Sequence, residues 1–138
     1  MDSKYTPEEQ TENRRKWVEA LRSDKYNQTM GALCRRIDDS FEYCCLGVAC
    51  AISGLGKFAP RDYSQSGVYK FVIKEGQSQD AALPEPVRDW LGLSDRYGSY
   101  RGDSPSSLST NNDGGTLFIS IANIIESEPD GLISSIGE

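Results

Sequence analysis

The amino-acid sequence predicts an α+β fold, with about four helices around a buried central helix (44–53) and a small antiparallel sheet. Three observations lead to this prediction. A segment near the N-terminus has the capping residues of a helix. The stretch at 44–53 is apolar on every side, which is typical of a helix inside a core. The stretch at 67–74 alternates like a strand and is rich in β-branched and aromatic residues.

Length, charge and hydropathy narrow the class of protein. The 138 residues, 37% of them apolar, fit a single domain over residues 1–138 with a modest core. The formal net charge is −6, so the general basic surface of a nucleic-acid-binding protein is missing, and nucleic acid is not the expected partner. No run approaches the roughly 18 apolar residues that span a bilayer, and the first residues lack a signal-peptide core. We therefore expect a cytoplasmic protein without a membrane partner.

The first helix is expected to run from Pro7 to Ser23. Thr6 and Glu9 can form a capping box, and Pro7 stands at the first helical position, where its missing N–H does no harm. The first two turns are polar on all sides, and the apolar residues gather near the C-terminal end. Residues 1–13 are therefore expected to project partly into solvent or to meet a partner.

The middle of the chain is expected to contain the sheet and the central helix. Turns are predicted at 24–29 and 38–40, with a short extended segment between them that buries Leu33 and Ile37. The central helix runs from Cys44 to Ser53 and ends at Gly54, a natural residue for that place. The clearest strand follows at Gly67–Lys74.

Two more helices are expected towards the C-terminus. A short one begins after Pro84 and ends at Gly92, and the last one begins near Thr116. The segment 95–115 has no periodicity, so a long loop is predicted, either functional or disordered, and residues 130–138 are predicted to be a tail. The expected core consists of Trp17, Leu21, Leu46, Val48, Cys50, Phe71, Trp90, Phe118, Ile121 and Ile125.

Several short motifs occur in a fixed order along the chain. They are Ala20-Leu21-Arg22-Ser23 with Tyr26 and Gln28, Tyr43-Cys44-Cys45-Leu46-Gly47-Val48 with Cys50, Leu83-Pro84 with Val87 and Trp90-Leu91-Gly92-Leu93, and Gly115-Thr116 with Phe118, Ile121-Ala122 and Ile125-Glu126. Over most of residues 14–128 the chain thereby resembles a group of small accessory proteins encoded by tailed bacteriophages and prophages. The resemblance implies the cytoplasm of a bacterial host and a role in host takeover or in evasion of bacterial defences.

The four cysteines are expected to be buried, reduced thiols. The chain has no histidine, and successive helical residues lie about 100° apart, so the thiols of Cys44, Cys45 and Cys50 point in three directions. We therefore expect no metal and no cofactor. A thiol in the first helical turn would have a lowered pKa, but a nucleophile would still need a base, and imidazole is absent. No catalytic residue is predicted, and small buried thiols suit the core.

Two further patterns have simpler explanations than catalysis. The paired carboxylates at 8–9 and 38–39 fit a helix cap and a turn. The segment Asp113–Thr116 precedes the last helix, where free N–H groups would hold a phosphate, unless the loop merely closes onto the helix. Gly114 and Thr116 are therefore candidate ligand-binding residues.

The remaining candidate residues combine arginine with tyrosine. Guanidinium groups suit phosphate and tyrosine rings suit base stacking, although both residue types are equally common in protein interfaces. These candidates are Arg35, Arg36, Arg61, Tyr63, Tyr97, Tyr100 and Arg101.

The sequence and the resemblance together favour a counter-defence binding protein. It would sequester a nucleotide-type signalling molecule or bind a host defence protein. A homo-oligomer with a basic pocket between subunits would favour sequestration, and an exposed aromatic patch without a pocket would favour a protein partner. The alternative is a small enzyme acting on a nucleotide or another small molecule, which a pocket lined by both carboxylate and arginine would favour.

Overall fold

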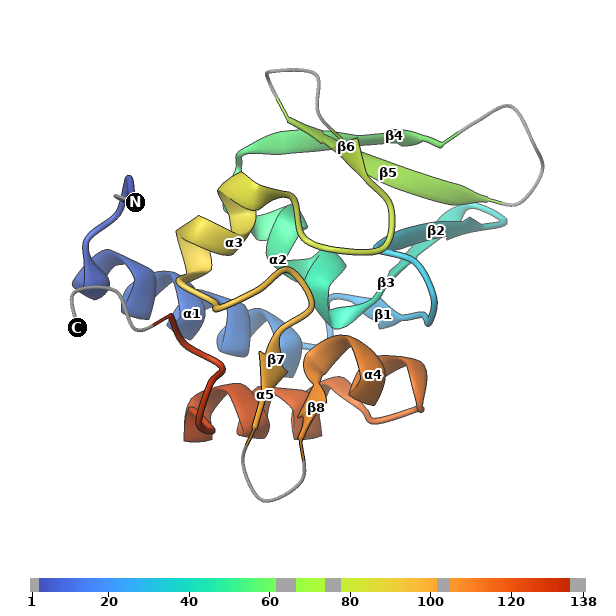
Figure 1. Ribbon diagram of the computed structural model, residues 1–138. Helices are drawn as coiled ribbons and strands as arrows, with labels where there is room; N and C mark the ends of the chain where they lie inside the picture. Colours follow the sequence, from blue (N-terminus) through green and yellow to red (C-terminus); the bar gives the residue numbers. More distant parts are fainter. Residues whose placement is uncertain (1–2, 62–66, 74–77, 102–104, 135–138) are drawn as a thin grey trace.

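The computed structural model describes residues 3–61, 67–73, 78–101 and 105–134. A sheet forms one side of the molecule, and the helix α2 (Cys45–Ser53) lies between this sheet and the helices α1 (Pro7–Arg22) and α5 (Phe118–Ser127), as Figure 1 shows. The helix α3 (Glu85–Leu91) packs beside α1 and α2. The predicted α+β fold and its central helix are confirmed. None of the helices in the described ranges has the length and apolar content needed to cross a bilayer.

The sheet is mixed rather than purely antiparallel. Its strands are β1 (Asn27–Gln28), β2 (Cys34–Ile37), β3 (Ser40–Tyr43), β4 (Gly56–Pro60), β5 (Val68–Ile73) and β6 (Ser78–Gln79). Their order is β1-β3-β2-β5-β4, with β6 also paired to β5. Only β1 and β3 are parallel among these pairs. The strand predicted at 67–74 is β5, at the centre of the antiparallel part.

The central helix is buried as expected. Leu46, Val48 and Cys50 are fully inaccessible to solvent, and the indole N–H of Trp17 donates to the Cys45 carbonyl over 2.9 Å. Gly54 ends α2 with a φ of 72°. The whole predicted core is buried, whereas the expected burial of Ile37 is wrong, because this residue is 42% exposed at the end of β2, next to the turn.

The N-terminal half of α1 is exposed on one side and packed on the other, with Pro7, Glu8, Glu9, Thr11 and Glu12 exposed. The capping box of Thr6 and Glu9 is present, and Pro7 follows it. Beyond this cap, however, Gln10 is only 7% exposed and Asn13 only 8%, because both pack against α3. The buried polar residues of this helix therefore belong to a helix–helix contact.

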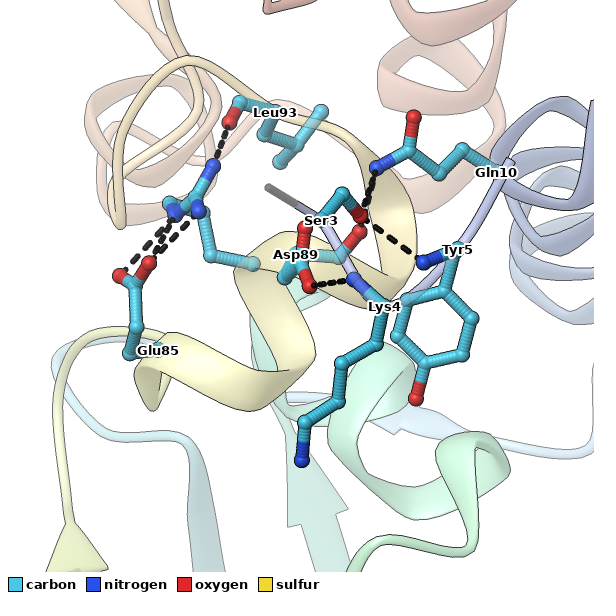
Figure 2. A network of polar contacts seen from close by, with 8 residues as sticks. Ser3, Lys4, Tyr5, Gln10, Glu85, Asp89 and Leu93 are labelled. Carbon is cyan, nitrogen blue, oxygen red and sulfur yellow. Dashed lines mark hydrogen bonds and ion pairs between the residues drawn. The ribbon is translucent and has the colours of Figure 1, made fainter. Parts of the chain in front are cut away.

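That contact satisfies the C-terminal carbonyls of α3. Gln10 donates to the Asp89 carbonyl over 2.7 Å, Asn13 to that of Trp90 over 2.9 Å, and Arg14 to that of Leu91 over 2.6 Å. A helix end leaves its last carbonyls short of partners, and of these three the Asp89 carbonyl also accepts from the Gly92 N–H over 3.1 Å. Figure 2 shows the neighbouring contacts, in which the N-terminal arm also reaches the Asp89 carboxylate through the Lys4 backbone N–H.

The segment 95–115 contains regular structure, so the prediction of a long loop is wrong in its described part. It holds the hairpin of β7 (Ser99–Tyr100) and β8 (Ser106–Ser107), followed by the helix α4 (Leu108–Asp113). The Ser107 side chain caps α4 by accepting from the Thr110 N–H over 2.9 Å. The described part of the chain thus has five helices rather than about four.

The C-terminal tail is partly packed. Leu132 is fully buried, and Ile133 forms an antiparallel bridge with Leu93. The rest of the predicted tail, from residue 135 onwards, lies outside the described residues.

Candidate functional site

The face of the sheet that points away from α2 carries two of the candidate residues, Arg35 and Arg61. Phe71 and Ile73 on β5 are buried in the core, so the alternating residues Val68 and Lys70 face outwards. Arg35 on β2 pairs with Val68. On the other side, the Arg61 N–H, just beyond β4, donates to the Val68 carbonyl over 3.0 Å. Two arginines therefore flank Val68 across three strands.

A hollow of about 290 Å³ lies on this outer face. Arg61 and Lys70 supply positive charge, and β6 and the residue after it supply a hydroxyl, an amide and a carboxylate. The lining residues are Arg61, Lys70, Ser78, Gln79 and Asp80. We call this hollow the sheet pocket.

The charge of the outer face is opposite to that of the whole chain. Lys57 pairs with Val72 in β4–β5 and so shares the face of Lys70, while Glu42 pairs with Arg35. Among the described residues of this face and the sheet pocket there are therefore four cationic side chains and two carboxylates, although the net charge of the protein is −6. Such segregation produces a local positive field that attracts anions.

The ion pair of Arg61 with Asp80 in the sheet pocket is exposed to solvent and weak. Nη1 of Arg61 lies 3.4 Å from Oδ2 of Asp80, and the two side chains are 42% and 37% exposed. An exposed pair of this kind contributes only about 0–1 kcal/mol. The guanidinium fork of Arg61 and the ammonium group of Lys70 are both groups that suit phosphate oxygens.

The candidate arginines and tyrosines do not form one surface. Arg36 faces the inner side at the hairpin of β2 and β3, where its Nε donates to the Asp38 carbonyl over 3.0 Å. Tyr63 lies outside the described residues. The hairpin of β7 and β8, which carries Tyr100, lies on the opposite side of the molecule from β4 and β5 in Figure 1. The composite Arg/Tyr surface that the sequence suggested is therefore divided.

The three candidates near the β7–β8 hairpin make local contacts. Tyr100 accepts a hydrogen bond from Nδ2 of Asn111 over 2.7 Å, and the Arg101 N–H donates to the Asp130 carbonyl over 2.6 Å. Tyr97 is 46% exposed, and its carbonyl accepts from the Ser109 N–H. Their backbone and hydroxyl groups tie the hairpin to α4 and to the C-terminal segment.

Gly114 and Thr116 do not form a phosphate cradle. The Gly114 N–H donates to the Thr110 carbonyl over 3.0 Å, and the Thr116 N–H to that of Asn111 over 2.9 Å. The first N–H of α5, from Phe118, donates to the Gln28 side chain over 3.1 Å. This loop closes onto the helix, which is the simpler of the two explanations that the sequence left open, and the N–H groups of these three residues are not free.

A buried amide network that the sequence analysis missed explains this closure. Asn112 is fully buried, and its Oδ1 accepts from the Cys45 N–H over 3.1 Å and from Gln28 over 2.8 Å. Its Nδ2 donates to the Thr29 carbonyl over 2.7 Å. Asn112 thus accepts a hydrogen bond from the N-terminus of α2, and Gln28 accepts one from the N-terminus of α5. The signal in the sequence was Gln28 itself, a polar residue of the first motif.

The thiols are buried and protonated. All four cysteines are free and buried, which confirms that part of the expectation. Burial raises the pKa of Cys34 to about 12 and that of Cys44 to about 11, although the Gly47 N–H donates to the Cys44 sulfur. A lowered pKa in the first turn of α2 is therefore wrong, because desolvation outweighs the helix dipole. Within the described ranges, no three Cys, Asp or Glu residues are grouped to hold a metal ion.

A second hollow, of about 410 Å³, has the opposite electrostatic character. It lies along the N-terminal half of α1 and is lined by Tyr5, Glu8, Glu9, Glu12, Asn13, Lys16 and Trp90. Its three carboxylates face a single ammonium group, so a phosphate would be repelled. The sheet pocket is therefore the better candidate for an anionic ligand.

Comparison with known proteins identifies a family but no activity. No curated protein matches the chain significantly. No solved structure matches it significantly either. A family model described as a domain of unknown function, DUF8296, matches residues 10–129, which include every helix from α2 to α5 and most of α1. The chain accordingly belongs to the DUF8296 family.

Proposed function

We propose that the sheet pocket binds a phosphate-bearing, nucleotide-type small molecule and that the protein acts by sequestering it. The observation that carries this proposal is the gathering of Arg35, Lys57, Arg61 and Lys70 on one sheet face of an acidic protein. In keeping with the resemblance of its motifs, the protein would do this as a bacteriophage or prophage accessory factor in the host cytoplasm, against a bacterial defence signal.

The composition of the sheet pocket supports phosphate more than other anions. Arg61 offers a planar fork that can bind two oxygens at once, and Lys70 adds a compact charge one strand away. Ser78 and Gln79 add neutral donors to the same hollow. A volume of about 290 Å³ is just below the roughly 300–1,000 Å³ typical of small-molecule sites, which fits part of a nucleotide.

A second candidate function is an enzyme that acts on the same class of ligand. The observation in its favour is Asp80, a carboxylate placed 3.4 Å from the Arg61 guanidinium within the pocket. Carboxylate and arginine together can position and polarise a phosphate ester. This alternative is separated from sequestration by asking whether the ligand is chemically changed.

Calorimetric titration with ADP and with tripolyphosphate at low ionic strength tests the binding. Lys70→Gln should weaken binding at least tenfold, since it removes a charge from the pocket. Lys16→Gln is the matched control, because Lys16 lies on α1, on the far side of α2 from the sheet, and it should leave binding unchanged. Unchanged ³¹P resonances of ADP after long incubation support sequestration, and new resonances support the enzyme. No binding of either probe, or equal binding by Lys70→Gln, contradicts the proposal.

A further inference from the structure

We propose that a small cavity between α1 and α5 binds a short aliphatic carboxylate on the guanidinium group of Arg14. The cavity has a volume of about 140 Å³ and is lined by Thr11, Arg14, Arg15, Val18, Ile125, Glu126 and Glu128. We call it the Arg14 cavity. It shares no residue with the sheet pocket, so this site stands independently of the proposed function.

The Arg14 guanidinium is buried, and its hydrogen-bond partners among the described residues are neutral groups. Arg14 is 7% exposed. Its Nη1 donates to the Leu91 carbonyl over 2.6 Å, and its Nη2 donates to the Thr11 hydroxyl over 3.1 Å. The nearest carboxylate, on Glu128, lies 3.8 Å away, beyond hydrogen-bond distance. Because a guanidinium group has five N–H donors, it retains donors for a carboxylate at the cavity wall.

A close anion stabilises the charged form of a buried cation of this kind. Burial lowers the pKa of Arg14, and Glu128 counteracts this only in part. The C-terminal end of α3, whose Leu91 carbonyl it contacts, supplies a partial negative charge. A carboxylate at hydrogen-bond distance would add a full charge where the structure provides only dipoles and a distant ion pair.

The size and walls of the cavity define the rest of the ligand. Val18 and Ile125, which are 6% and 1% exposed, line it with aliphatic carbon. A volume of 140 Å³ corresponds to about four or five water molecules at roughly 30 Å³ each. An acid with a few carbon atoms fits, and a nucleotide does not. The neighbouring Arg15 is already paired with Glu12 and Glu19.

Glu128 shows what such a ligand would look like. Its side chain, two methylene groups and a carboxylate, is chemically a tethered propionate, and it is 55% exposed. The residue ends α5 with a φ of 49°, an uncommon backbone conformation for glutamate. Its ion pair with Arg14 is long, so a free carboxylate can displace it and bind the guanidinium directly.

Titration of the full-length protein with propionate, followed by methyl and arginine side-chain NMR signals, tests this proposal. Propionate should shift the signals of Ile125 and Arg14 in a saturable way, and propionamide, which has the same shape without the charge, should not. Glu128→Gln removes the competing carboxylate and should tighten propionate binding several-fold. Glu126→Gln is the matched control, because Glu126 lines the cavity but pairs with Arg22, and it should change the affinity less than twofold.

Three outcomes would overturn the proposal. One is the absence of a saturable shift in both the wild-type protein and Glu128→Gln. Another is an equal response to propionamide, which would indicate an apolar hollow without carboxylate recognition. The third is equal tightening by Glu126→Gln and Glu128→Gln, which would reduce the effect to general surface charge.

Discussion

At the scale of single residues, Gly47 shows how closely the central helix approaches the chain ahead of β2. A Cβ atom at this position would overlap the carbonyl oxygen of Leu33, which belongs to the backbone and cannot move aside. Gly47 lies in the first turns of α2, and Cys44 donates its N–H to the same Leu33 carbonyl over 3.2 Å. The glycine of the second motif is therefore explained by packing.

Gly47→Ala should lower the free energy of unfolding by about 3 kcal/mol, the upper end of ordinary overpacking costs. Gly54→Ala is the comparison, since a Cβ there meets no atom within 4 Å and only the φ of 72° is unfavourable. Its cost should be about 1 kcal/mol. Urea unfolding of the two variants measures the difference, and equal losses would contradict the close approach of α2.

The buried thiols should make the protein sensitive to alkali. The pKa of Cys34 rises from its ordinary 9.0 to about 12, and that of Cys44 to about 11, chiefly through burial. Below pH 9 these thiols are protonated in both states, so their contribution to stability is fully present. Between pH 9 and about 11–12 only the unfolded state loses the proton, and stability falls.

Urea unfolding at pH 7.5, 9 and 10.5 measures this fall. Cys34→Ala is the informative variant, because it removes one of the shifted groups while other groups that titrate in alkali remain. Its stability should decline less steeply above pH 9 than that of the wild-type protein. Parallel declines would mean that the Cys34 thiol is not desolvated.

At the scale of elements, the polar half of α1 acts as a cap for α3. Asn13→Leu should cost about 1–3 kcal/mol, because the Trp90 carbonyl would be left buried without its donor. Lys16→Ala, on the exposed side of the same helix, should stay within about 0.5 kcal/mol of the wild-type stability. Thermal or urea unfolding compares the two. A small effect of Asn13→Leu would show that water can replace the amide.

The sequence predicted those elements whose signals are local. The box of Thr6 and Glu9, the apolar run of α2 and the alternation of β5 each lie within one segment. It did not predict α4, the β7–β8 hairpin or the parallel pairing of β1 with β3. These depend on distant partners, such as Asn112, whose amide joins the start of α2 to the chain at Thr29. Patterns within one segment of the sequence do not indicate contacts between residues that are far apart in the chain.

At the scale of the whole molecule, charge is segregated between two sides. The outer face of the sheet is basic around Arg61 and Lys70, whereas the hollow beside α1 holds Glu8, Glu9 and Glu12. Of the sequence candidates, Arg35 and Arg61 fall on the basic face. Lys70 was not a candidate, because its place beside Arg61 and Asp80 depends on the pairing of β4 and β6 with β5. The predicted burial of Phe71 puts Lys70 on the outer face, but the two neighbouring strands were not predicted.

The most direct test of the central claim is to ask what the protein binds in an extract of infected bacteria. Purified protein is incubated with extract of infected, defence-active bacteria, recovered, denatured by heat, and the released compounds are analysed by mass spectrometry. We expect an intact phosphate-bearing compound from the wild-type protein and much less of it from Lys70→Gln. Release of a chemically altered compound, equal release from both proteins, or no compound at all would contradict sequestration at the sheet pocket.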